Sequence, residues 1–179
     1  MISIQQFPNV CVDFFNSTLQ KTLCHQLSLA QLSRNLNQFL LMSGAGLMKD
    51  VLEQLDAAIY ESVKPEHRYR VKELRSRTLT TLWGDVTFKR RYYQDMQDKS
   101  YHYLLDEWLN LEKYAHIDPL CQATLVSHAA DVSYSKAAAL TTPQGLSAQS
   151  VLHTIRKWVR FPIMQRLCRN PNPISRKCM

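Results

Sequence analysis

Apolar side chains recur at helical spacing through the first third of this 179-residue chain. A run over residues 28–42 and a second run over residues 47–59 each place large apolar side chains on one helix face. The second stripe consists of Leu47, Val51, Leu55 and Ile59. The segment Ser43–Gly46 predicts a break between two helices, and Pro65 predicts the end of the helical region. Core packing explains such stripes, and a helix–helix interface between two chains is the alternative.

An alternating pattern follows, because β-branched and aromatic residues predict two strands of a β-hairpin, Thr78–Trp83 and Val86–Tyr93. Gly84-Asp85 predicts a two-residue turn between them, in which Trp83 faces Val86. One side of the ribbon should dock on the core, and the other should expose hydroxyl groups and cations. The cations in the second strand are Lys89, Arg90 and Arg91. They suit phosphate contacts, and protection of an edge strand against aggregation explains them equally well.

Three helices are expected after residue 117. Asp118-Pro119 combines an N-cap acceptor with a proline suited to the first turn, so a helix should run to about Asp131. Ser133 or Ser135 can cap a short second helix, and Ser147 can open a third. This order and these short connections are typical of a helix-turn-helix unit.

The third of these helices separates two faces. At 100° per residue, one face carries Ala148, Val151, Ile155 and Trp158, and the opposite face carries Gln149, His153, Arg156 and Arg160. A polar face of this kind can enter a major groove, where its donors meet base edges and phosphates. The candidate DNA-binding residues on this helix are Gln149, Ser150, His153, Arg156, Lys157 and Arg160. An ordinary amphipathic surface helix is the alternative.

Charge is divided unevenly along the chain, whose net formal charge is +7. Residues 1–63 hold three cations and five carboxylates, residues 64–91 nine and three, residues 92–131 two and seven, and residues 132–179 eight and none. The balances are therefore −2, +6, −5 and +8. Two basic blocks separated by an acidic one suggest two surfaces for a polyanion, and they favour the DNA-binding interpretation of the third helix.

Composition indicates a globular protein of the cytoplasm. The chain is 45% hydrophobic, and its five cysteines are widely spaced without a C-x-x-C pair, which fits reduced thiols. The longest purely apolar run, Phe39–Met42, is too short to cross a bilayer, and the first residues lack the cationic region of a signal peptide. No membrane partner is expected.

The sequence nominates neither a catalytic group nor a cofactor. The acidic candidates are Asp106, Glu107 and Glu112. They lie in or beside Tyr101–Leu111, which predicts a short helix, and a solvated helix face explains them better than a metal cage does. Cys121 and His128 would lie two helical turns apart, about 10 Å along the axis, beyond the reach that a base and its nucleophile need.

Four blocks of sequence, in order, resemble the N-terminal half of the ISLre-type insertion-sequence transposases. The blocks are "LTTLWGDVTFKRRYYQD", "YHYLLDEWLNLEKYAHI", "ADVSYSKAAAL" and "SAQSVLHTIRKW". The resemblance implies a front part that recognises element ends and a later ribonuclease-H-like domain that cuts and joins DNA with metal-bound carboxylates. Here the tail "RFPIMQRLCRNPNPISRKCM" contains no acid, and it suggests truncation before the catalytic domain.

Together these patterns predict a mainly α protein with one β-hairpin, an α+β fold. We expect N-terminal helices over residues 1–63, a basic hairpin and acidic helix over 64–117, a helix-turn-helix module over 118–160, and an irregular basic tail over 161–179. The expected partner is double-stranded DNA at element ends, with no cofactor and with a nucleoid-associated location. Whether the chain is an enzyme stays open. The alternatives are a helical fragment that pairs with itself or with intact transposase, and a remnant without function.

Overall fold

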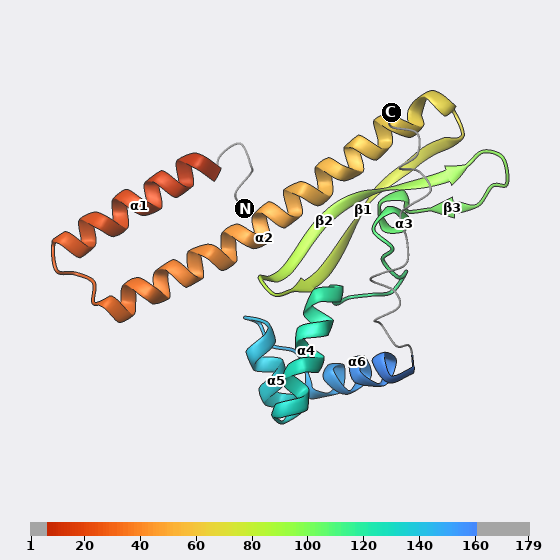
Figure 1. The fold of residues 1–179 in the computed structure, drawn as a ribbon. Coiled ribbons are helices and arrows are strands. Elements are labelled where there is room, and N and C mark those ends of the chain that lie inside the picture. Colours follow the sequence, from red (N-terminus) through yellow and green to blue (C-terminus); the bar gives the residue numbers. More distant parts are fainter. Residues whose placement is uncertain (1–6, 161–179) are drawn as a thin grey trace, which may run out of the picture.

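The computed structural model describes residues 7–160 and confirms an α+β fold with a small antiparallel sheet (Figure 1). The elements are α1 (Phe7–Leu23), α2 (Leu29–Val63), the 3₁₀ turn η1 (Lys64–Glu66), β1 (Tyr69–Thr81), β2 (Gly84–Asp95), β3 (Tyr101–His102), α3 (Leu104–Trp108), α4 (Pro119–Asp131), α5 (Tyr134–Thr141) and α6 (Ala148–Arg160). Helices α2 and α3 pack against the sheet, and α4–α6 lie beyond one end of it. The tail expected over residues 161–179 lies outside the described residues. Within residues 7–160, no helix combines the length and apolar character that a bilayer span requires.

The prediction of a break at Ser43–Gly46 is wrong, because α2 runs through this segment as one helix of 35 residues. Its start is fixed by a capping box, in which Ser28 accepts from the amide of Gln31 and the Gln31 side chain accepts from the amide of Ser28. Gly44 lies against the ring of Trp83, where a Cβ atom would come within 2.6 Å of the ring. The glycine therefore permits close packing of the helix against the hairpin tip.

The hairpin forms, but the predicted turn is wrong by two residues. Thr81 pairs with Gly84 and Leu79 pairs with Val86, so Leu82 and Trp83 form the turn. The Thr81 hydroxyl accepts from the Trp83 amide at 3.1 Å and donates to the Gly84 carbonyl at 2.8 Å, which closes the turn early. Gly84, at φ +109°, serves as the first residue of β2. Because the shift is two residues, each side chain that remains in the paired strands keeps its predicted side of the ribbon.

The main core lies between α2, the hairpin and α3. It consists of Leu52, Ile59, Leu79, Val86, Phe88 and Leu105. α2 also covers the edge of β2, because the Glu53 carboxylate accepts from the Lys89 amide at 2.9 Å and the Asp56 carboxylate accepts from the Arg91 amide at 3.1 Å. These contacts satisfy strand amides that would otherwise be open to another chain.

The short helix predicted over Tyr101–Leu111 is present, but it is much shorter than predicted. Tyr101 and His102 pair with the end of β2 as strand β3, and α3 covers only five residues. Asn110, at φ +51°, lies just beyond the helix, where the backbone has left helical geometry. This compact corner places α3 directly over the core side of the hairpin.

Helices α4, α5 and α6 form the predicted three-helix unit around a second core of Leu125, Ala138 and Val151. The caps are confirmed in part: Asp118 accepts from the Cys121 amide, and Ser147 accepts from the Ser150 amide, whereas the Ser133 side chain makes no cap bond. Thr80 of β1 bonds to the backbone of residues 116 and 118, at 2.7 and 2.9 Å. These two bonds attach the unit to the sheet.

Candidate nucleic-acid interface

The polar face predicted for α6 is exposed. Gln149, His153 and Arg156 all point away from the core, whereas Val151 and Thr154 are buried. Ile155 and Trp158 are half-buried as expected, and Ala148 is exposed, contrary to its predicted place on the buried face. Arg160 belongs to the helix, but its side chain lies outside the described residues.

Part of this face forms one wall of a groove of about 440 Å³. Gln149, Ser150, His153 and Lys157 line it from α6, and Tyr114 and His116 line it from the segment before α4. Lys157 forms an ion pair with Glu112, which is not part of the groove lining. Arg156 is exposed and is not part of the groove lining. The residues predicted on α6 therefore lie in two places. Arg156 lies on the outer surface, and Gln149, Ser150, His153 and Lys157 line the groove.

Of the three hairpin cations, one is exposed. Lys89 is exposed on the open side of the sheet, beside Thr78 and Thr87, whose hydroxyl oxygens lie 2.8 Å apart. Arg91 is half-buried and donates to the Asp56 carboxylate at 2.5 Å. Arg90 is buried on the side of the ribbon that docks on the core, so it is not available for the phosphate contact predicted for it.

The burial of Arg90 is explained by a charged cluster under α3. The carboxylate of Asp106 is shared by Arg90 and by Arg77, which lies at 2.6 Å. Arg77 also donates to the carbonyl oxygens of Glu112 and Ala115, both at 2.8 Å. The interpretation of Asp106 as a solvated acid is therefore wrong. It lies on the core side of α3 next to Leu105, where two arginines from the hairpin reach it.

Burial disfavours the charged forms of the arginines in this cluster. Burial and the neighbouring Arg77 charge lower the pKa of Arg90 to about 10, and burial also lowers the pKa of Arg77. The Arg90 guanidinium lies 3.7 Å from the centre of the Tyr103 ring, a cation–π contact. The cluster is built to fix α3 on the sheet, and its arginines are unavailable to an external phosphate.

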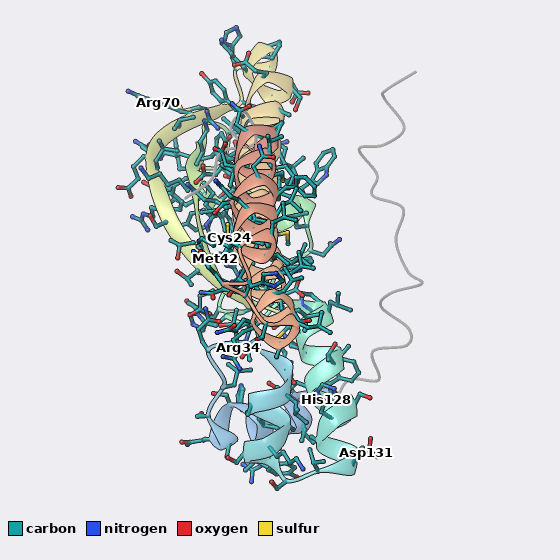
Figure 2. The ribbon with its side chains drawn as sticks, turned by 90° about the vertical axis from the view of Figure 1, so that its left-hand side faces the viewer. Cys24, Arg34, Met42, Arg70, His128 and Asp131 are labelled. Carbon is teal, nitrogen blue, oxygen red and sulfur yellow. The ribbon has the colours of Figure 1, made fainter. Side chains whose placement is uncertain are left out.

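The sequence-based site omitted exposed cations at the start of β1. Arg70 and Lys72 are both exposed, and Figure 2 shows Arg70 extending away from the sheet. Strand β1 contains a bulge between Val71 and Glu73, which places Lys72 outside the regular ladder. The available signal was the cationic stretch before the hairpin, which forms the first half of β1.

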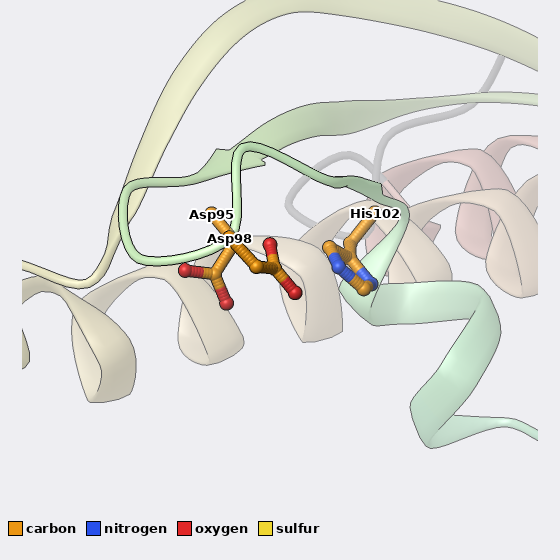
Figure 3. Close-up of side chains that lie close together, drawn as sticks. All are labelled: Asp95, Asp98 and His102. Carbon is orange, nitrogen blue, oxygen red and sulfur yellow. The ribbon is translucent and has the colours of Figure 1, made fainter.

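One group of side chains has the proximity of a metal site. The ligand atoms of Asp95, Asp98 and His102 lie within 4.8 Å of one another (Figure 3). Asp95 already accepts from Arg68 at 2.7 Å and from the Gln97 amide at 2.8 Å. These bonds, led by the Gln97 amide, lower the pKa of Asp95. The oxygen atoms are used by protein donors, so we assign this group to the turn between β2 and β3.

Cys121 is buried in α4, and burial raises the pKa of its thiol to about 11. A thiol that stays protonated at neutral pH is a poor nucleophile. His128 bonds instead to the Thr141 hydroxyl at 3.1 Å. The arrangement therefore fits packing of α4 against α5.

A profile of the family described as "Uncharacterised protein family (UPF0236)" matches residues 22–168, most of the chain. The chain belongs to the UPF0236 family. Its relatives include UPF0236 proteins of Caldanaerobacter subterraneus subsp. tengcongensis. One is 28% identical over 151 residues, which are 84% of this chain and 32% of the relative. Another is 31% identical over 114 residues, which are 64% of this chain and 24% of the relative.

This chain therefore spans about a third or less of the length of the curated relatives that it matches. No solved structure matches the chain.

Proposed function

We propose that this UPF0236 chain binds double-stranded DNA through α6. The observation that carries the proposal is the exposed face of Gln149, His153 and Arg156 on the last helix of a three-helix unit. Amide, imidazole and guanidinium groups are the donors that read base edges and phosphates in a major groove. Residues 132–179 contain no carboxylate that would repel the duplex.

The hairpin supplies a second cationic surface in this proposal. Lys89 on the open side of the sheet and the exposed Arg70 and Lys72 of β1 can contact phosphates. Such contacts position a protein on DNA without reading its sequence. Arg90 and Arg91 have no part in this surface, since each is held by a buried carboxylate.

The biological setting that we propose is recognition of the ends of an insertion sequence, as the N-terminal part of a transposase. The resemblance of four sequence blocks to ISLre-type transposases supports it. One relative carries a name that joins eleven locus designations of a single organism. Several loci under one protein name are what copies of a mobile element leave in a genome. The longer relatives leave room for a separate catalytic domain.

A mobility-shift titration tests this function with duplexes that carry the element's terminal repeats and with scrambled duplexes of equal length. We expect tighter binding to the repeats. If His153 contacts a base, His153→Ala should cost about 1–3 kcal/mol on the repeats and little on scrambled DNA. Equal binding to both duplexes would remove end recognition, and no binding at low salt would remove DNA binding altogether.

A further inference from the structure

The N-terminal helices form an arm that extends beyond the sheet. We define the arm as α1 together with residues 29–42 of α2, which run antiparallel to one another (Figure 1). Phe14 and Phe39 stack between the two helices, with ring centres 4.1 Å apart. Figure 2 views the arm from its end, where Cys24 lies in the connection between the helices. None of the side chains of α1 is buried.

Both helices of the arm expose an apolar stripe. The stripe of α1 consists of Val12, Phe15, Leu19 and Leu23, and the stripe of α2 consists of Leu29, Leu36 and Leu40. Their spacings, i, i+3, i+7, i+11 and i, i+7, i+11, keep each stripe on one side of its helix. These seven residues, which we call the arm face, are between 45% and 79% exposed.

The two stripes open on the same side of the arm. The half-buried side chains of the arm, which include Phe14 and Phe39, mark the line along which the two helices touch. In each helix the centre of the exposed stripe lies roughly 80–120° around the axis from the centre of these half-buried positions, in the direction of increasing residue number. Because the helices are antiparallel, equal displacements in this sense point to the same side. The arm face is therefore continuous across both helices.

We infer that the arm face binds the arm face of a second copy of this chain. The side chains by which α1 packs on α2 are only half-buried, so covering the arm face would add the tertiary packing that stabilises most helices. The arm carries only Asp13, Lys21 and Arg34 as formal charges, and helical geometry places all three away from the stripes. A charge-free face repels no identical face, and a twofold axis would place each stripe against its equivalent.

The size of the arm face fits this partner. Seven side chains at these exposures correspond to roughly four fully exposed ones, and full burial of one Val, Leu or Phe side chain contributes about 1.5–3 kcal/mol. The uncharged face also lacks the cations that contact DNA, so self-association is independent of the function proposed for α6.

Light scattering during size-exclusion chromatography tests the inference on the full chain. We expect twice the chain mass of 20.8 kDa at micromolar concentration. Leu36→Gln should weaken dimerisation at least about tenfold, the effect of losing 1.4 kcal/mol of interface energy. Leu29→Gln should do the same, and at 79% exposure its replacement leaves the monomer fold intact.

Met42→Gln is the matched control, because Met42 is 62% exposed but lies roughly 160° around α2 from Leu40. It should leave the dimer unchanged, as should Arg156→Ala. A monomeric wild-type chain would overturn the inference. So would stripe variants that dimerise like the wild type, or a Met42→Gln variant as weakened as Leu36→Gln.

Discussion

Asp106 shows how strongly one residue can determine the stability of this fold. Its buried carboxylate neutralises two buried guanidinium groups, Arg77 and Arg90. Asp106→Asn would leave both charges without a counter-ion, so we expect a loss of about 3–5 kcal/mol in the free energy of unfolding. Urea denaturation at neutral pH measures this loss.

The neighbouring acid Glu107 provides the control for that measurement. Glu107 is exposed and pairs with His102 at 2.8 Å, so Glu107→Gln should change the free energy of unfolding by less than about 1 kcal/mol. Similar losses for the two variants would contradict the assignment of Asp106 as the structural counter-ion.

The burial of Tyr93 predicts how the stability of the fold changes at alkaline pH. Its phenol is fully buried, its hydroxyl has no hydrogen-bond partner among the described residues, and burial raises its pKa well above the ordinary 10.0. The folded state keeps a proton that the unfolded state loses, so stability should fall as the pH rises above about 10. We expect Tyr93→Phe to reduce this fall and to be close to neutral in stability at pH 7. Comparing the free energies of unfolding of the wild type and Tyr93→Phe at pH 7 and 10.5 tests this expectation. Tyr101→Phe, at an exposed tyrosine, is the control.

At the scale of the elements, the contact of α2 with the hairpin tip predicts an effect opposite in sign to helix propensity. Glycine to alanine inside a helix normally stabilises by about 0.5–1 kcal/mol. At Gly44 the new Cβ would lie 2.6 Å from the Trp83 ring, so Gly44→Ala should instead destabilise by about 1–3 kcal/mol. In a Trp83→Ala background the substitution should regain its normal stabilising sign. Chemical denaturation of the wild type, the two single variants and the double variant measures this double-mutant cycle. Destabilisation by Gly44→Ala in both backgrounds would contradict the contact.

Elements set by local chemistry were predictable from the sequence. The start of α4 at Asp118-Pro119 and the opening of α6 after Ser147 follow from caps that act within three residues. Positions set by distant contacts were not predictable. The glycines of α2 indicate a break until Trp83 is known to lie against them, and Gly84 indicates a turn until Thr81 is seen to close one earlier.

In the candidate site, too, exposure that is set by local periodicity could be predicted, whereas burial that is set by distant contacts could not. Exposure of Gln149, His153 and Arg156 follows from helical periodicity within a single element. The burial of Arg90 depends on Asp106, which is distant in sequence and lies on a helix whose extent was predicted incorrectly. Three adjacent cations in a strand therefore have three different environments.

At the scale of the whole molecule, the chain combines three surfaces with different chemistry. The arm face is apolar, the open side of the sheet carries hydroxyl groups and Lys89, and α6 presents a polar face with Arg156. A dimer held by the arm face would carry two copies of α6. This combination connects the self-association that we infer with the DNA binding that we propose.

The most direct test of DNA binding by α6 is a fluorescence anisotropy titration of a labelled duplex over a range of salt concentrations. We predict binding at low salt that weakens linearly on a logarithmic salt scale. If Arg156 contacts a phosphate, Arg156→Ala should lower that slope by roughly one, whereas Lys21→Ala, which removes the same charge from the arm, should leave it unchanged. An Arg156→Ala variant that binds as Lys21→Ala does, or a wild-type chain that fails to bind at low salt, would contradict the account.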